Sequence, residues 1–184
     1  PLVLDFVRNS TNLVSALKPI VMDFARKLEK AFRLKGFAGE VDESEAAFFV
    51  RFIHYFGDRK VGEETASAHV DQSGFTFHIF ESDKGLQCLS YKGKWIDMPV
   101  SNGETVIIPA MQMQFRSKGK LKALCHRVVA IPETAVNGRY SAVCFIQLKN
   151  TLKYDKDRCG RLQEKKPGFN YDMPFSEFSK LFKA

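Results

Sequence analysis

The sequence SAHVDQSGFTFHIF, from Ser67 to Phe80, places a histidine and an aspartate two residues apart inside an apolar segment with the pattern of a β-strand. Side chains at positions i and i+2 of a strand point to the same face, so His69 and Asp71 are predicted to project together. That arrangement suits two ligands of one metal ion. Alone it is a weak signal, because a half-buried pair of this kind can also be hydrogen-bonded structure without a metal.

Short β-rich segments surround this stretch on both sides. Turn sequences such as SDKG, YKGK, SNGE and VNGR separate them, and we expect no helices in between. This pattern is typical of an antiparallel sandwich or barrel, and we predict a mainly β fold of the double-stranded β-helix (jelly-roll) type. The expected strands are AFFVRFIHYF, SAHVD, GFTFHIF, GLQCLSY, TVIIPA, ALCHRVVAI and RYSAVCFIQL.

A long helix is expected ahead of the strands, because apolar residues recur at three- and four-residue steps from Leu13 to Phe32. Its cap is expected among three polar residues, and Pro19 is expected to kink the helix or to move its start. Two glycines should then end it in a turn. The three cap candidates are Asn9, Ser10 and Thr11, and the two glycines are Gly36 and Gly39.

At 184 residues the chain is long enough for one domain and too short for two. We divide it into a helical part (1–45), a jelly-roll core (46–148) and a C-terminal extension (149–184). The extension is polar and charged and ends in a short predicted helix, which we expect to act as a lid or helical cover. The apolar face of that helix is formed by Phe175, Phe178, Leu181 and Phe182.

A third candidate ligand lies in the segment ALCHRVVAI, where His126 follows Asp71 by 55 residues (126 − 71). Strand alternation puts His126 on one face and Cys125 on the other, so an inward His126 makes Cys125 a non-ligand. Two imidazoles and one carboxylate form a facial triad, which leaves the remaining positions of an octahedral Fe(II) open for substrate and O2. Zinc is the second choice of metal.

A further pair, Arg139 and Ser141, occupies positions i and i+2 of the last predicted strand. The guanidinium and the hydroxyl can bind the same carboxylate. In isolation this pair is better explained by a surface salt bridge. The strongly apolar residues that follow favour an inward arginine, which would then need an anionic partner. A dicarboxylic acid whose 2-oxo acid end chelates iron would provide that partner.

The order of these motifs resembles the Fe(II)/2-oxoglutarate-dependent dioxygenases, in the branch that includes isopenicillin N synthase. The resemblance runs from about Arg51 to Leu148. The segments that carry it are RFIHYF, HVDQSGFTFHIF, GLQCLSYKGKWIDMPV, SNGETVIIP, CHRVVAIP and RYSAV. The set of His-X-Asp, distal His and Arg-X-Ser in this order is specific, whereas the GLQ and GKW segments are supporting detail.

This resemblance implies that His69, Asp71 and His126 bind Fe(II). It also implies that Arg139 and Ser141 bind the 5-carboxylate of 2-oxoglutarate, with the phenol of Tyr55 joining their hydrogen-bond network. A core tyrosine with a satisfied hydroxyl is an equally good interpretation of Tyr55. Enzymes of this branch carry a further region ahead of the long helix, so a chain truncated at its N-terminus is one interpretation of the sequence.

The expected reaction couples oxidative decarboxylation of 2-oxoglutarate by O2 to hydroxylation or desaturation of a small molecule, with ascorbate as a reductant. Two alternatives stay open: an iron oxidase of the same branch that does not use 2-oxoglutarate, and a non-catalytic jelly-roll binding module. We expect structural roles for His54 and His78, since His78 would share its strand face with Thr76 and Phe80 and has no partner at metal-ligand spacing.

Charge and cysteine content narrow the possible partners. The net charge is +7, which favours anionic partners, and a small acidic co-substrate satisfies this as well as a nucleic acid would. We expect no nucleic-acid partner, because the sequence lacks a basic stripe interleaved with aromatic residues. No apolar run is long enough to cross a membrane. The four cysteines form no CxxC pair, so we expect reduced thiols and a cytoplasmic protein.

Overall fold

The computed structural model describes residues 2–42, 48–99, 103–117 and 119–148. It begins with α1 (Leu2–Phe32) and the short α2 (Phe37–Asp42). A turn that contains Gly36 at positive φ connects the two helices. The apolar side of α1 buries Leu17, Val21 and Ala25. Among the described residues no helix is long and apolar enough to span a membrane.

Eight strands follow, and they form two antiparallel four-stranded sheets. The first sheet has the order β1-β8-β3-β6 and the second has the order β2-β7-β4-β5. This arrangement confirms the mainly β, jelly-roll prediction. The strands are β1 (Phe48–Tyr55), β2 (Glu64–His69), β3 (Phe75–Glu81), β4 (Leu86–Leu89), β5 (Trp95–Asp97), β6 (Val106–Pro109), β7 (His126–Val129) and β8 (Arg139–Ile146).

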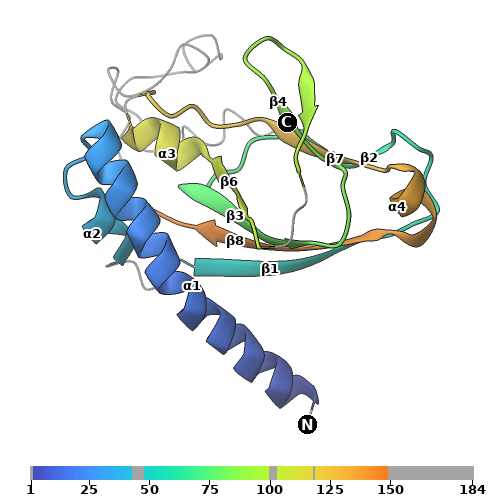
Figure 1. The fold of residues 1–184 in the computed structure, drawn as a ribbon, viewed down its shortest axis with the longest axis horizontal. Coiled ribbons are helices and arrows are strands. Elements are labelled where there is room, and N and C mark those ends of the chain that lie inside the picture. Colours follow the sequence, from blue (N-terminus) through green and yellow to red (C-terminus); the bar gives the residue numbers. More distant parts are fainter. Residues whose placement is uncertain (1, 43–47, 100–102, 118, 149–184) are drawn as a thin grey trace, which may run out of the picture.

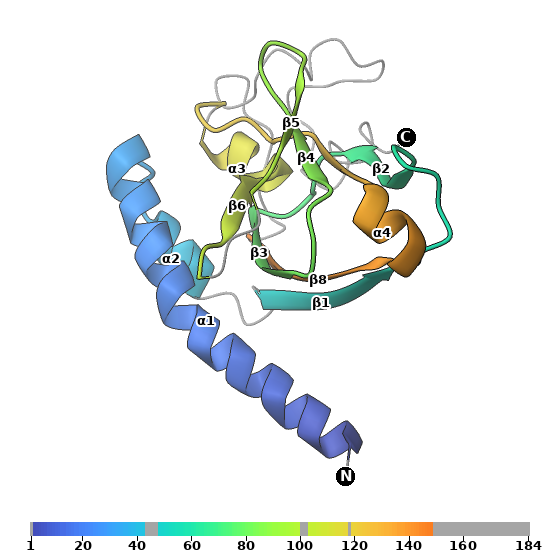
Figure 2. The same cartoon turned by 45° about the vertical axis from the view of Figure 1, so that its right-hand side comes forward.

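The face of the first sheet that α1 covers is apolar, whereas its other face combines polar residues with side chains of a second apolar cluster. Phe75 and Phe77 of β3, with Cys144 and Ile146 of β8, form one core with the buried side of α1. Figures 1 and 2 show α1 lying against this sheet on the side away from β2 and β7. Because strand side chains alternate, the neighbouring residues of β3 and β8 point toward the second sheet, and these include the polar candidates.

Three local predictions were wrong. α1 begins at Leu2, so the three polar cap candidates lie inside it and Pro19 does not mark its start. Gly39 lies within α2 and does not form a turn. Two helices lie between strands, namely α3 (Met111–Arg116) and α4 (Pro132–Asn137). The proposed C-terminal helix falls outside the described residues.

Candidate active site

The pairing of β2 with β7 brings the two candidate histidines together. His69 is the last residue of β2 and His126 is the first residue of β7, and the register places them directly opposite each other. Their ring centroids are 4.4 Å apart. Asp71 lies beyond the end of β2, so the prediction that His69 and Asp71 share a face of one strand was wrong. The carboxylate of Asp71 nevertheless faces both imidazoles.

The three side chains converge with their ligand atoms facing one another. One ligand atom from each of His69, Asp71 and His126 lies within 4.8 Å of the other two. The Nε2 atom of His69 is 3.6 Å from Oδ1 of Asp71, and Nε2 of His126 is 3.9 Å from Oδ2. The sequence-predicted triad is therefore brought together in space.

Hydrogen bonds to the backbone fix which imidazole nitrogen faces the aspartate. Nδ1 of His69 lies 2.7 Å from the carbonyl oxygen of Ser67, and Nδ1 of His126 lies 3.2 Å from that of Leu124. A carbonyl oxygen can only accept, so each Nδ1 carries the proton. In each neutral ring Nε2 then has a free lone pair, as a metal ligand requires.

Asp71 is buried, and neighbouring groups hold its carboxylate in place. The hydroxyl of Thr76 donates a hydrogen bond of 2.6 Å to Oδ2. Burial acts to raise the pKa of Asp71, but hydrogen bonds from His69 and Thr76 and the charge of His126 outweigh it, so this pKa lies below its ordinary value. The carboxylate is accordingly ionised at neutral pH.

The two histidines differ in their electrostatic environment. A hydrogen bond with Asp71 raises the pKa of the half-exposed His69 above its ordinary value. Burial lowers the pKa of His126, and the charge of Asp71 opposes this effect only in part. A proton therefore competes with a cation more strongly at His69 than at His126.

This donor set fits a divalent cation. Two neutral imidazole nitrogens and one carboxylate, gathered on one side, are the ligands that Fe(II) takes in facial-triad sites, and zinc accepts the same atoms. Among the described residues, Asp71 forms ion pairs only with the two imidazoles. A cation would balance its charge.

Arg139 and Ser141 are both buried on β8, which passes between β1 and β3. Gly138, at a φ of 78°, precedes them, and a Cβ at this position would lie 2.5 Å from the carbonyl oxygen of Tyr55. The missing side chain therefore lets β8 pair with β1, and this pairing sets Tyr55 opposite Arg139. The inward orientation expected for the arginine is what the structure shows.

The anionic partner of Arg139 is an internal residue that the sequence did not reveal. Nη2 of Arg139 donates to Oε2 of Glu81, and the hydroxyl of Ser141 donates to Oε1 over 3.1 Å. The side chain of Glu81 is buried, with 9% exposed. Because both donors bind one carboxylate here, the arginine and serine have the geometry of a carboxylate clamp, a name we use below for this pair.

A register shift in β3 explains why Glu81 faces the clamp. His78 pairs with Val143, but Phe80 pairs with Ala142 and Glu81 with Ser141, so Ile79 is an additional residue. This bulge puts His78 and Glu81, three residues apart, on the same face, and leaves Phe80 on the other. The prediction that His78 and Phe80 share a face was wrong for this reason.

His78 completes the buried cluster. Its Nδ1 lies 2.6 Å from Oε1 of Glu81, and its ring centroid is 6.2 Å from that of His126. The side chain is 8% exposed, and Nε2 has no hydrogen-bond partner among the described residues. His78 thus connects the metal-binding end of the site to the clamp.

Tyr55 contacts the clamp through its ring. The guanidinium carbon of Arg139 lies 5.4 Å from the ring centroid, within the range of a cation–π contact. Burial raises the pKa of the Tyr55 phenol, and the charge of Arg139 opposes this. The structure places Tyr55 beside the clamp, and the contact that it shows uses the ring face, whereas the role expected from the resemblance concerned the phenol.

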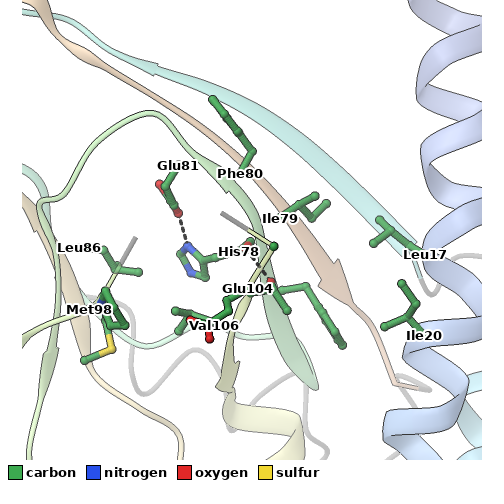
Figure 3. A pocket seen from close by; sticks show the side chains of 14 residues that line it. Leu17, Ile20, His78, Ile79, Phe80, Glu81, Leu86, Met98, Glu104 and Val106 are labelled. Atoms are coloured by element: carbon green, nitrogen blue, oxygen red, sulfur yellow. Dashed lines mark hydrogen bonds and ion pairs between the residues drawn. The ribbon is translucent and has the colours of Figure 1, made fainter. Parts of the chain in front are cut away.

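A cavity of about 430 Å³ adjoins these residues. Figure 3 shows His78 and Glu81 in its wall together with apolar side chains, among them Leu86, Met98 and Val106. The three candidate metal ligands do not line this cavity, and His78 lies between it and His126. The size and apolar lining suit a small organic molecule.

Comparisons with known proteins agree with this geometry. The model of the 2OG-Fe(II) oxygenase superfamily matches residues 45–148. The chain belongs to this superfamily. The description of the superfamily names Fe(II) and 2-oxoglutarate, and the matched region includes all three candidate ligands and the clamp.

Curated relatives from Arabidopsis thaliana are similar over part of their length. The chain is 30% identical over 122 residues to 1-aminocyclopropane-1-carboxylate oxidase 4, which covers 64% of this chain and 36% of that protein. It is 28% identical over 147 residues to feruloyl CoA ortho-hydroxylase 2, covering 76% of this chain and 38% of the relative. The chain thus spans little more than a third of the length of these relatives.

Among solved structures, the dioxygenase for auxin oxidation in rice has a similar fold. The TM-score is 0.69 at 18% identity, over 95% of this chain and 57% of that structure. At this identity the similarity concerns the fold alone, and it supports the jelly-roll assignment.

Proposed function

We propose that the chain is the catalytic core of an iron-dependent oxygenase that couples oxidative decarboxylation of 2-oxoglutarate to oxidation of a small organic molecule. The observation that carries this proposal is the convergence of His69, Asp71 and His126, with Nε2 of each imidazole directed at the carboxylate. In members of the superfamily, bound iron supplies the activation of O2. The overall balance converts 2-oxoglutarate, O2 and a C–H bond into succinate, CO2 and an alcohol.

The residues of the chain would contribute binding, orientation and exclusion of water. His69, Asp71 and His126 would hold the metal, and Thr76 would keep the carboxylate of Asp71 in position through its hydroxyl. Arg139 and Ser141 would bind the far carboxylate of the co-substrate, with the ring of Tyr55 against the guanidinium. The apolar wall of the adjoining cavity would receive the substrate and keep water out.

The test is succinate formation by the purified chain supplied with Fe(II), 2-oxoglutarate, ascorbate and O2. Slow succinate formation without a substrate, and faster formation with a suitable one, is the expected result. A panel of small aromatic and carboxylic acids would serve as candidate substrates. If no succinate forms and 2-oxoglutarate does not bind, the proposed function is wrong.

A second candidate is an oxidase of the same superfamily that uses no 2-oxoglutarate. The specific observation in its favour is that Glu81 already engages Arg139 and Ser141. The relative that is an oxidase by name is consistent with this alternative. Substrate-dependent O2 consumption without succinate would identify it, whereas ligand binding without any O2 consumption would indicate a binding module.

A further inference from the structure

Glu81 binds the clamp in the manner expected of a ligand carboxylate. Oε2 accepts from Arg139, while Oε1 accepts from Ser141 and lies 2.6 Å from Nδ1 of His78. Three donors therefore converge on one internal carboxylate, and the buried guanidinium already has an anionic partner.

Two contacts besides that with Glu81 orient the guanidinium. Nε of Arg139 donates to the carbonyl oxygen of Asp83 over 3.0 Å, and Tyr55 lies against the guanidinium. Ser141 is fixed by the pairing of β8 with β3. The clamp would thus keep its shape if the carboxylate of Glu81 moved away, and its donors would be free for another acid.

Two carboxylates cannot share this site without a large electrostatic cost. The charge of Arg139 is balanced by Glu81, which forms an ion pair with it, so an added carboxylate would lack a cation of its own at the clamp. Like charges a few ångströms apart repel strongly where water is excluded. An acid that binds Arg139 must therefore replace Glu81.

The structure offers a second position for the displaced carboxylate. Glu81 also forms a hydrogen bond with His78, which does not involve Arg139. Glu81 and His78 both border the 430 Å³ cavity. Glu81 is also the last residue of β3, just beyond the bulge, where strand pairing ends. A rotation of its side chain could release Arg139 and keep the contact with His78.

We propose that Glu81 is an internal competitor for the clamp, which the far carboxylate of a dicarboxylic co-substrate displaces toward His78. This inference deepens the proposed function and rests on it, because it identifies the residue that sets the affinity for the co-substrate. The wild-type chain accordingly binds such acids weakly, and removing the charge of Glu81 strengthens their binding.

The experiment compares wild type with Glu81→Gln and Glu81→Asp. Glutamine keeps the size of the side chain without its charge, whereas aspartate keeps the charge but is one methylene shorter. Glu40→Gln is the matched control, because Glu40 forms a partly buried ion pair with Arg116 away from this site. Thermal unfolding of each variant shows which ones are folded.

Two probes are titrated calorimetrically without O2: 2-oxoglutarate with Mn(II)-loaded protein, and glutarate with metal-free protein. Glutarate lacks the 2-oxo group, so it reports on the clamp and not on metal chelation. We expect Glu81→Gln to bind both acids at least about tenfold more tightly than wild type. Glu81→Asp should lie in between, and Glu40→Gln should equal wild type.

Equal or weaker binding by Glu81→Gln would overturn the inference, and so would a lack of binding by all proteins. If the glutamine variant does not fold, Glu81→Asp decides in the same way. The two proposals fail separately. Tighter glutarate binding by a chain that never forms succinate would refute the proposed function alone, whereas succinate formation with unchanged affinities in Glu81→Gln would refute the competitor alone.

Discussion

The metal-binding cluster and the carboxylate clamp both face the space between the sheets, yet they differ in charge balance. Among the described residues Asp71 forms ion pairs only with imidazoles, so a bound cation would balance its negative charge. The guanidinium of Arg139 is already matched by Glu81. The metal-binding cluster therefore gains an ionic interaction when it binds a cation. The clamp, in contrast, must lose its ion pair with Glu81 before it binds another carboxylate.

Removal of the carboxylate from the metal-binding cluster should have the largest effect. We expect Asp71→Ala to lower the affinity for Fe(II) by more than about 100-fold, since loss of a group that only supports a ligand already costs 10–100-fold. Metal titration under anaerobic conditions measures this. Asp97→Asn, on the exposed β5, should bind metal as wild type does; an equal loss there would contradict the assignment.

Removal of the charge from the clamp should affect stability. Arg139→Met leaves the carboxylate of Glu81 without its guanidinium partner, and we expect the free energy of unfolding to fall by about 3–5 kcal/mol. The double variant Arg139→Met/Glu81→Met removes both charges and should recover most of this loss. Urea unfolding measures all three proteins. A double variant less stable than Arg139→Met would show that the pair itself stabilises the fold.

The hydroxyl of Thr76 offers a finer test of the metal-binding cluster. Thr76→Val keeps the side-chain shape but removes the 2.6 Å hydrogen bond to Asp71. We expect the affinity for Fe(II) or Mn(II) to fall by about tenfold. Thr76→Ser, which keeps the hydroxyl, should stay near wild type. An unchanged affinity in the valine variant would mean that Asp71 is oriented by other contacts.

The dependence of metal binding on pH should be the mildest effect. The pKa of His69 is raised by Asp71, so a rise in pH removes a proton that competes with the metal. His126 and Asp71, with lowered pKa values, are already deprotonated at neutral pH. Affinity should therefore increase by about tenfold per pH unit until pH exceeds the pKa of His69.

Calorimetry in buffers of different ionisation enthalpy should detect release of at most one proton per metal ion from the ligands. A constant metal affinity between pH 5 and pH 8 would contradict the protonation states described for the two imidazoles.

Much of the fold could be predicted from the sequence, because strand alternation and turn residues are local signals. The strand around Tyr55 and the strand from Arg139 both form as expected. The start of the first helix could not be located, since α1 includes Pro19 and polar residues that often begin a helix. The helix at Pro132 carried a recognisable signal, a proline at its first position, but no helix was expected between the strands.

In the candidate site, the metal ligands could be predicted from the sequence but the partner of the clamp could not. The order of His69, Asp71 and His126 was informative because each residue type is uncommon in an apolar segment. Glu81 could not be assigned, since simple alternation puts it on the opposite face from His78. Only the register with β8 shows that Ile79 is additional and that Glu81 lies opposite Ser141.

Because of the bulge, the direction of the Glu81 side chain does not depend on the presence of Ile79. Deleting Ile79 would leave His78 and Glu81 two positions apart, so the acid would keep its inward direction, while one apolar side chain would be lost from the layer under α1. A strand β3 without Ile79 would therefore still present the carboxylate of Glu81 to Arg139.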